Sequence, residues 1–470
     1  MSEFTKIIEA MRVAVPAQRP ALDDAEASVL RQLTERLAGE RPEAAAEYER
    51  FLSVANREIC LPEGEVRRRV EGATILLTGG TGCIGSTLVG QLAARNPARI
   101  VSVSRGVTDR WPRWPSVEYR HADVTDAAAL AGLTRQVRPD IVFHVAAQRS
   151  PALAETEVHH TVSVNTLGTR NVLAAAAGAG VAQVVCASTG KALRPYSPDI
   201  YTAAKRAAEW VCATMAAGTS SEDGDSSISI SASGTSGMLV SAGRFTHVID
   251  NSIVHDRLRR WAKDTGPGAA LRLHGPEIAF YVQSAVESAQ LLLVAMTGAV
   301  PGEFRVHAIS DLGWPVALLD VALGVLDREG SRTPVYISGY DPGYEEIAFP
   351  GLYDPATAGD VSPLINAFES ARLRPSPCPR VDAFRLDLAA LPAAPKLLAD
   401  LDGVCAQTQD SRAVRSALDE LSWTLLDATL AAASPAALAR CSCLVRRYED
   451  GLSLVHRRVM KAISAHADQP

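Results

Sequence analysis

Residues 72–85 read Gly72-Ala73-Thr74-Ile75-Leu76-Leu77-Thr78-Gly79-Gly80-Thr81-Gly82-Cys83-Ile84-Gly85. This stretch predicts a buried strand, a glycine-rich turn and a helix that begins at about Ser86. Gly79, Gly82 and Gly85 leave bare backbone where a dinucleotide pyrophosphate approaches a helix N-terminus. The spacing alone is only moderately specific for a dinucleotide site. Motifs further along the chain are therefore needed to decide whether this turn binds a dinucleotide.

Two further motifs follow in the order that an oxidoreductase requires. They are Ala187-Ser188-Thr189-Gly190-Lys191 and Tyr201-Thr202-Ala203-Ala204-Lys205. Oxidation of a secondary alcohol needs a base that takes the hydroxyl proton as hydride leaves for nicotinamide. Tyrosine has an ordinary pKa of about 10, and we expect the positive charge of Lys205 to lower the pKa of Tyr201. We expect Lys205 also to hold the nicotinamide ribose, and Thr189, or less favourably Ser188, to orient the reacting oxygen.

The composition indicates a soluble, multidomain protein. At 470 residues the chain exceeds one ordinary core, so two or three domains are expected. The net charge of −6 favours neither nucleic acid nor an anionic membrane as partner. No apolar run reaches the ~18 residues of a membrane span, and the first residues lack a signal-peptide pattern, so a cytoplasmic location is expected. The scattered cysteines predict reduced thiols, and the pair Cys441 and Cys443 is a weak metal signal.

The pattern along the chain predicts an α/β fold: a Rossmann-type, doubly wound parallel sheet with a smaller substrate lobe and added terminal helices. We expect a helical N-terminal extension at 1–70, the dinucleotide-binding domain at 71–245, a mixed α/β substrate lobe at 246–390 and a helical C-terminal extension at 391–470. The predicted strands are Thr74–Leu77, Ile100–Ser104, Ile141–Val145, Gln183–Ala187, Ile228–Ala232 and Met238–Arg244. An exposed loop is expected at 218–227.

The end of the second predicted strand bears on cofactor choice. An acidic residue there selects NAD, whereas arginine suits the 2′-phosphate of NADP. Ser104 and Arg105 therefore favour NADP, with NAD as the alternative if Arg105 is only a solvated loop charge. Asp123 is placed to accept from the adenine amino group. The expected cofactor residues are Thr78, Gly79, Thr81, Gly82, Cys83, Ile84, Gly85, Ser104, Arg105, Asp123, Val124, Ala146, Ala147 and Lys205.

The chain resembles the extended short-chain dehydrogenase/reductase family. Within that family it is most similar to the polysaccharide-biosynthesis nucleotide-sugar dehydratases, typified by UDP-N-acetylglucosamine 4,6-dehydratases. The resemblance spans roughly residues 73 to 375 and includes the glycine turn, Asp140–Ala147, the segment around Asn165, Ser188–Ala192 and Tyr201–Lys205. It implies an NAD(P)-dependent enzyme that oxidises a sugar hydroxyl, then eliminates water, epimerises or reduces. It also implies a small-molecule substrate, with a homodimer as a common assembly.

Departures from the family pattern change the expected chemistry. The family has Asp-Lys after the catalytic threonine, the Asp acting on the leaving hydroxyl, whereas this chain has Gly190-Lys191. Lys191 remains as a candidate second base or substrate ligand. His247 replaces an Asn and is either a substitute acid or a structural histidine. Arg149 is either an anion ligand or a surface ion-pair partner. The pair His159-His160 reads as a helix face rather than a metal site.

These residues predict an NADP-dependent enzyme that oxidises a secondary alcohol of a sugar or sugar-like polyol, expected to be nucleotide-linked. Thr189, Tyr201, Lys205 and Lys191 are the expected catalytic residues, and Arg149, Ser188 and His247 the expected substrate ligands. An epimerase or a modified dehydratase is favoured. The first alternative is an NADPH-dependent ketoreductase acting on a non-nucleotide metabolite. The second is a dinucleotide-binding sensor or scaffold without turnover.

Overall fold

The computed structural model describes residues 1–106, 112–218, 237–251, 254–344, 358–387, 394–446 and 453–467. The chain divides into two compact units. Unit 1 comprises Met1–Glu58, His247–Ala285 and Leu312–Glu346, and unit 2 comprises Ile59–Thr246, Val286–Asp311 and Ile347–Pro470. Among the described helices, none combines the length and the apolar character needed to cross a membrane.

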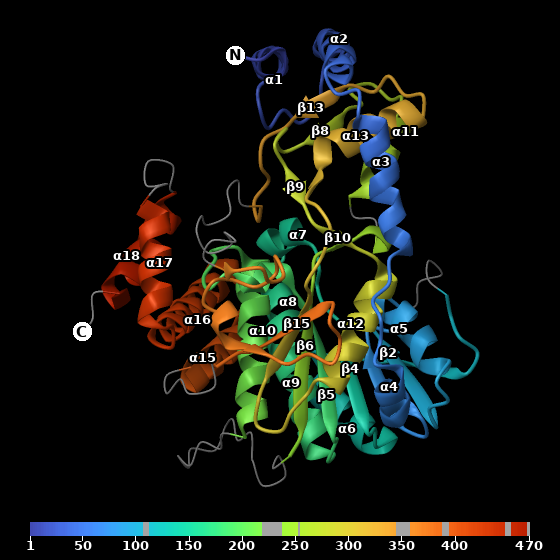
Figure 1. Ribbon diagram of the computed structural model, residues 1–470, viewed down its shortest axis with the longest axis vertical. Coiled ribbons are helices and arrows are strands. Elements are labelled where there is room, and N and C mark those ends of the chain that lie inside the picture. Colours follow the sequence, from blue (N-terminus) through green and yellow to red (C-terminus); the bar gives the residue numbers. More distant parts are fainter. Residues whose placement is uncertain are drawn as a thin grey trace. The chain divides into compact units, whose positions relative to one another are not determined.

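Unit 2 is built on a nine-stranded sheet with the strand order β14-β15-β11-β6-β5-β4-β1-β2-β3 (Figure 1). The first six strands are parallel and follow the spatial order 3-2-1-4-5-6 of a doubly wound dinucleotide fold. They are β1 (Thr74–Thr78), β2 (Arg99–Ser104), β3 (Val117–His121), β4 (Ile141–His144), β5 (Gln183–Thr189) and β6 (Leu239–Phe245). This order confirms the predicted α/β fold class.

Three more strands extend the sheet beyond β6. They are β11 (Arg305–Ile309), β15 (Val381–Arg385) and β14 (Leu373–Arg374). Strand β11 is parallel to β6, β15 is antiparallel to β11, and β14 is antiparallel to β15. The predicted strand Ile228–Ala232 and most of the predicted loop 218–227 lie outside the described residues. Where the structure describes the predicted strands, each is present within one or two residues of its expected bounds.

One helix precedes the first strand of unit 2, and others lie between its parallel strands along the chain. They are α4 (Glu63–Val70), α5 (Cys83–Ala93), α6 (Ala127–Val137), α7 (Pro151–Thr156), α8 (Val158–Val162), α9 (Gly168–Gly178), α10 (Ile200–Ala217) and α12 (Ala285–Thr297). The longest crossover helix, α10, begins where the carboxylate of Asp199 accepts a 2.8 Å bond from the backbone N–H of Thr202. It ends at Gly218, which adopts the left-handed conformation.

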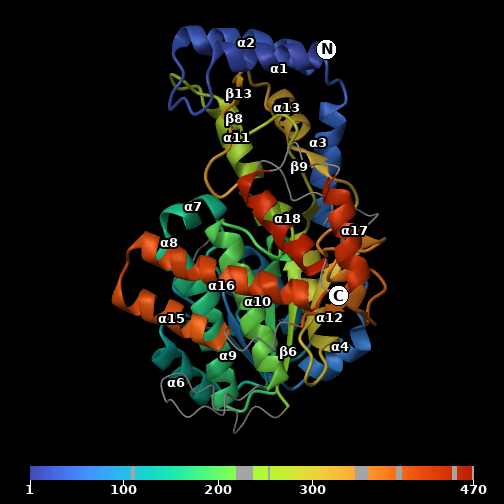
Figure 2. The same ribbon diagram turned by 90° about the vertical axis from the view of Figure 1, so that its left-hand side faces the viewer.

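The C-terminal helices pack on one another, and one of them packs on α10. They are α15 (Ala394–Gln407), α16 (Ser411–Ala431), α17 (Pro435–Arg446) and α18 (Leu454–Ala467). Helix α16 crosses α10 and also contacts α8 (Figure 2). Ion pairs of Arg415 with Glu155 (2.7 Å) and of Arg170 with Asp402 (2.8 Å) join this layer to the sheet-covering helices.

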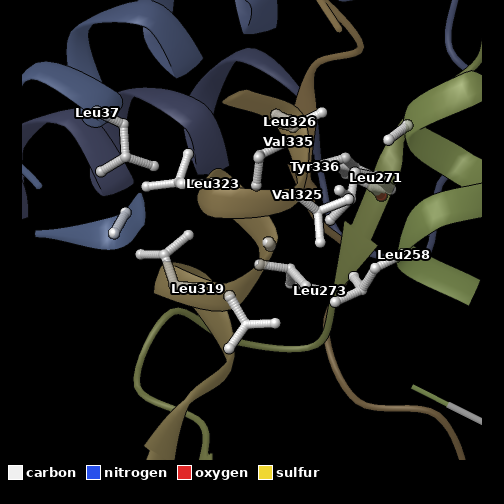
Figure 3. Close-up of a cluster of buried hydrophobic side chains, with 14 of the residues drawn as sticks. Leu37, Leu258, Leu271, Leu273, Leu319, Leu323, Val325, Leu326, Val335 and Tyr336 are labelled. Carbon is white, nitrogen blue, oxygen red and sulfur yellow. The ribbon is translucent and has the colours of Figure 1, made fainter. Parts of the chain in front are cut away.

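Unit 1 has its own hydrophobic core (Figure 3). Its helices are α1 (Glu3–Ala14), α2 (Asp24–Gly39), α3 (Ala44–Ser53), α11 (His255–Lys263) and α13 (Leu318–Arg328). Its short strands are β7 (His247–Val248), β8 (Leu271–Leu273), β9 (Ala279–Phe280), β10 (Val282–Gln283), β12 (Val316–Ala317) and β13 (Val335–Ile337). Leu37 of α2, Leu323 of α13 and Leu271 of β8 meet in this core.

The four consecutive domains predicted from the sequence are regrouped in the structure. The N-terminal helices are not a separate extension, because their apolar faces pack with segments of the predicted substrate lobe. Helix α4 and the C-terminal helices belong instead to the unit that contains the dinucleotide-type sheet. The assignment of residues to two cores thus follows which apolar faces meet rather than their order along the chain.

Candidate active site

The glycine turn sits between the carboxyl end of β1 and the start of α5. Gly79 has a φ of 78°, and a Cβ atom there would lie 2.7 Å from the backbone nitrogen of Ala146. A Cβ at Gly85 would lie 2.2 Å from the carbonyl oxygen of Gly79. Both positions therefore exclude any side chain. The helix begins at Cys83, earlier than the predicted Ser86, because Gly82 is already its N-cap.

This turn has the features that a dinucleotide pyrophosphate requires. The N-cap of α5 is Gly82, which has no side chain to bond the N–H groups of the first turn. The first N–H groups of the helix and its dipole therefore form an anion-binding terminus. The turn also lies at the point where the strand order reverses between β1 and β4, where ligands of this fold class bind. The residues fit an NAD(P) group, whose chemistry would be to accept and return hydride.

The expected ribose and adenine residues follow β2 and β3. The hydroxyl groups of Ser104 and Thr81 both donate to the carbonyl oxygen of Gly106, at 2.8 and 3.2 Å. The guanidinium of Arg105 is about half exposed, lies 3.9 Å from the Asp123 carboxylate and contacts the ring of His160 at 3.2 Å. Arg105 and Asp123 are thus brought together at this edge of the sheet.

Not every expected cofactor residue presents its side chain there. Thr78 and Val124 are buried, and Val124 packs against Gly168. Ala146 and Ala147 are partly exposed and exposed, as expected of small residues beside a ligand. Thr78 and Val124 therefore support this edge from within the unit.

His144 is a buried residue that the sequence analysis did not single out. Its Nδ1 is 2.8 Å from the hydroxyl of Thr78 and its Nε2 is 3.0 Å from the hydroxyl of Thr169. Burial, with the nearby charge of Lys205, lowers the pKa of His144 to about 3. The neutral ring therefore links the end of β1 to α9 beneath the glycine turn. Its place two residues before the Ala146-Ala147 pair is the signal that could have found it.

Thr189 and Tyr201 meet at the carboxyl end of β5. Thr189 is the last residue of that strand, and Tyr201 lies in the first turn of α10. A hydrogen bond from the Thr189 hydroxyl lowers the pKa of the Tyr201 phenol, although burial, the largest influence, raises it. The charge of Asp199 also raises this pKa and that of Arg149 lowers it. The structure thus places Thr189 close enough to Tyr201 for its hydroxyl to act on the phenol.

Lys205 lies one turn beyond Tyr201, but its ammonium has another partner. It donates a 2.8 Å hydrogen bond to the carbonyl oxygen of Ala187. Burial lowers the pKa of Lys205, and the neighbouring thiols and Glu209 oppose that shift. We expected Lys205 to lower the pKa of Tyr201, whereas in the structure the positive charge that does so belongs to Arg149. The difference arises because the Ala187 carbonyl holds the ammonium.

The short 3-10 turn after Thr189 carries Lys191. Its ammonium is 3.8 Å from the Asp199 carboxylate, which also lies 3.7 Å from the guanidinium of Arg194. Gly190 is buried, and a Cβ atom there would be 2.7 Å from Cδ2 of Leu364. Leu364 therefore fills the space into which a side chain at position 190 would project.

The loop that carries Arg149 is held from the neighbouring helix. Asn165 forms two 2.9 Å bonds with Gln148, accepting from its N–H and donating to its carbonyl oxygen. Asn165 lies in a π-helical turn at Ser163–Leu167, a distortion that often marks functional sites. This pairing places Arg149 near Tyr201.

Two further expected substrate ligands, Ser188 and His247, and the histidine pair have neighbours of their own. The hydroxyl of Ser188 donates a 2.6 Å bond to buried Glu209, so Ser188 is held by α10. His247 is exposed in unit 1, where its ring lies 4.4 Å from that of Phe280. His159 bonds to the carbonyl oxygen of Cys405 at 2.8 Å. Among the described residues, no cluster of three or more metal-binding side chains forms.

A family model described as "Polysaccharide biosynthesis protein" matches residues 75–348, more than half of the 470 residues. The chain belongs to the polysaccharide biosynthesis protein family. The probable polysaccharide biosynthesis protein EpsC of Bacillus subtilis (strain 168) is 25% identical over 313 residues, which cover 63% of this chain and 48% of that protein. A UDP-N-acetylglucosamine 4,6-dehydratase (inverting) of Campylobacter jejuni is 32% identical over 141 residues, 29% of this chain and 41% of that protein.

This member of the polysaccharide biosynthesis protein family spans about half the length of the curated relatives it matches. Among solved structures, that of Pen from Bacillus thuringiensis superposes with a TM-score of 0.54 and 19% identity. The match covers 68% of this chain and 90% of that one. This likeness supports the fold, and the site residues above carry the argument about chemistry.

Proposed function

We propose that this protein is an NADP-dependent extended short-chain dehydrogenase/reductase that oxidises a secondary alcohol of a nucleotide-linked sugar or sugar-like polyol. The observation that carries the proposal is the placement of Thr189 at the end of β5 beside the first turn of α10, which holds Tyr201 with Lys205 one turn further on. The pair ends β5, next to β4, and the glycine turn ends β1 on the other side of β4. The residues proposed for proton transfer and the turn proposed for the dinucleotide therefore both lie at the carboxyl ends of the parallel strands.

In this proposal Tyr201 exchanges a proton with the substrate hydroxyl. Thr189 stabilises the phenolate by donating a hydrogen bond, and Arg149 adds positive charge. The ammonium of Lys205 donates to the carbonyl oxygen of Ala187, two residues before Thr189 on β5. The bound dinucleotide would supply hydride transfer, and its pyrophosphate would lie at Gly82 and the start of α5.

The surroundings of Gly190 favour epimerisation over elimination of water. An elimination needs a proton donor for the leaving oxygen as well as a base. Leu364 occupies the space beside Gly190, so no donor can project from this position. Lys191 is the candidate base that would remove a proton next to a transient ketone and return it to either face. The side chain acts as a base only as the neutral amine, so it must first give up a proton; the Asp199 carboxylate, 3.8 Å from its nitrogen, keeps it near the end of β5.

A ketoreductase is the second candidate. The observation that favours it is Ala279, an exposed residue of β9 in unit 1, where the resemblance to the nucleotide-sugar dehydratases implies an arginine. A smaller or uncharged substrate needs fewer cationic ligands than a nucleotide diphosphate. Such an enzyme would consume NADPH in proportion to product.

The experiment incubates the protein with NADP and a panel of sugars linked to UDP, dTDP, GDP or CDP. The products are read by mass spectrometry in deuterated water, and the nicotinamide absorbance is followed. Deuterium uptake without a change in the NADPH total supports epimerisation. Loss of water supports a modified dehydratase, and net NADPH consumption with a carbonyl substrate supports the ketoreductase. If Tyr201→Phe retains every activity of the wild-type protein, the proposal fails.

A thermal-shift panel separates these enzymes from a binding module. A ligand at a hundredfold excess over its dissociation constant stabilises the native state by about 2.7 kcal/mol. A shift with NADP followed by a further shift with one nucleoside diphosphate supports a nucleotide-linked substrate. A shift with NADP alone, combined with no turnover of any substrate, points to a sensor or scaffold.

A further inference from the structure

Four charged side chains form a buried charge cluster at the end of β5. They are Arg206 and Glu209 of α10, Arg244 of β6 and Glu369, and each exposes at most 4% of its side chain. Arg244 forms two bonds to Glu209, at 2.8 and 2.7 Å, and two to Glu369, at 2.7 and 2.8 Å. Arg206 adds a 3.0 Å bond to Glu369. Two positive and two negative charges thus compensate one another, as burial requires.

Ser188 connects this cluster to the proposed catalytic pair. Its hydroxyl donates to Glu209 at 2.6 Å. On β5 it immediately precedes Thr189, and it pairs in register with Arg244 of β6. The peptide that carries Thr189 is therefore held by a side chain, Glu209, that three bonds from Arg206 and Arg244 also fix in place.

The segment that contains Leu364 and Asn366 also bonds to this cluster and to the loop after Thr189. The carbonyl oxygen of Leu364 accepts a 3.0 Å bond from Arg244, and the side-chain amide of Asn366 donates a 2.5 Å bond to the carbonyl oxygen of Leu193. Ala367 and Phe368 pack into the hydrophobic cluster of the C-terminal helices. The loop after Thr189 is thus held from both sides of the buried charge cluster.

We propose that Ser188 and Glu209 are positioning residues, which transmit the fixed geometry of the buried charge cluster to Thr189 and keep its hydroxyl on the Tyr201 phenol. The proposal rests on the proposed function, in which Tyr201 exchanges a proton with substrate. It assigns Ser188 a role other than substrate contact, because its hydroxyl is already donated to Glu209.

The titration midpoint of the Tyr201 phenol depends on the position of the Thr189 hydroxyl. The groups that act on its phenol are the Thr189 hydroxyl, the Asp199 carboxylate and the Arg149 guanidinium. Lys205 lies one turn along α10, and Lys191 and Arg194 face Asp199. Only the Thr189 bond depends on the peptide that Ser188 holds. A weaker Thr189 bond therefore moves the Tyr201 titration upward without a change in these charges.

The test is an NMR titration of the full-length protein with NADP, using tyrosine labelled with ¹³C. The Tyr201 resonance is assigned by its absence from Tyr201→Phe. Ser188→Ala removes the hydroxyl, and Ser188→Thr retains one. Ser241→Ala is the matched control, because Ser241 is a buried hydroxyl on β6 that donates to the Ala295 carbonyl at 2.8 Å.

We expect Ser188→Ala to raise the Tyr201 midpoint by about one pH unit, a tenfold effect. Ser188→Thr and Ser241→Ala should match the wild-type protein.

An unchanged midpoint in Ser188→Ala overturns the proposal, and so does an equal shift in Ser241→Ala. Once a substrate is known, a Ser188→Ala variant with a raised KM and an unchanged kcat overturns it as well, because that pattern indicates direct contact with substrate. A lowered kcat with an unchanged KM supports it. The titration needs no substrate. If no sugar nucleotide turns over, the proposed function is contradicted, whereas the effect of Ser188 on the Tyr201 midpoint is still measured.

Discussion

The side chain of Leu364 packs against Gly190, so closely that a Cβ atom at position 190 would come within 2.7 Å of its Cδ2. The two residues come from distant parts of the chain, and both lie in the unit that contains the dinucleotide-type sheet. Gly190 follows the catalytic candidate Thr189 directly. The contact therefore decides which side chains position 190 can accept.

Gly190→Asp is expected to destabilise the protein by about 1–3 kcal/mol, because it overpacks the space that Leu364 fills. Adding Leu364→Ala should recover much of that loss, since it removes the opposing methyl groups. Chemical denaturation measures both effects. Gly132→Ala is the control: Gly132 is a helical glycine of α6 with open space around its Cβ position, so its change should be neutral or stabilising. Equal destabilisation by Gly190→Asp with and without Leu364→Ala would contradict the packing argument.

Thr189→Val should lower kcat while leaving NADP affinity unchanged. Valine keeps the shape of threonine but cannot donate to the Tyr201 phenol. We expect a loss of roughly 10²-fold, within the range of general acid–base contributions. Steady-state kinetics and NADP titration measure the two quantities. Thr134→Val is the control, because the hydroxyl of buried Thr134 bonds to the Leu130 carbonyl in α6. Full activity in Thr189→Val would remove Thr189 from the mechanism.

The buried His144 predicts a loss of stability in acid. Burial lowers its pKa to about 3 in the folded protein, below the ordinary value of 6.5. The unfolded chain therefore binds the proton first, so this contribution is complete above pH 6.5 and declines as the pH falls toward 3. Between about pH 7.5 and about pH 5, the expected decline is about 2 kcal/mol.

His144→Gln should lack that decline. Urea unfolding of both proteins at the two pH values measures it as a difference. His307, whose pKa burial lowers to about 4, contributes in both proteins and cancels in the comparison. Identical pH dependence in the two proteins would show that His144 is not held neutral.

Arg105→Ala tests cofactor choice. If the Arg105 guanidinium meets a 2′-phosphate, its removal should weaken NADP binding roughly 10- to 100-fold, in line with about 1.5–3 kcal/mol for a charged hydrogen bond. NAD binding should stay unchanged. Isothermal calorimetry measures both affinities. Arg120→Ala on neighbouring β3 is the control, because Arg120 is paired with Glu118. Equal weakening of NAD and NADP by Arg105→Ala would place Arg105 outside the ribose pocket.

Local patterns predicted much of unit 2. The run before Gly79 and the YxxxK motif each lie within one strand–turn–helix or helix segment, so their apolar spacing and glycines determine their structure nearby. The helix start at Cys83 was predicted slightly late, because a glycine N-cap leaves no side-chain signal.

Contacts between distant segments could not be predicted in the same way. Glu369 bonds to Arg244 across 125 positions, and nothing near either residue marks the other as its partner. The grouping of α1–α3 with segments of the predicted substrate lobe depends on which apolar faces fit together in space. The partner of Lys205 could not be predicted either, since it is the backbone carbonyl of Ala187, which has no sequence signature.

The cover that α16 gives to α10 has a consequence for how this protein tolerates change. Fifteen of the eighteen residues of α10 are buried, so the helix that carries Tyr201 has almost no solvent-facing stripe. A saturation mutagenesis scan should therefore find α10 intolerant along nearly its whole circumference, without the three-to-four-residue rhythm of a surface helix. Attempts to evolve a new specificity would do better to leave this helix unchanged and to diversify the loops that follow the strands.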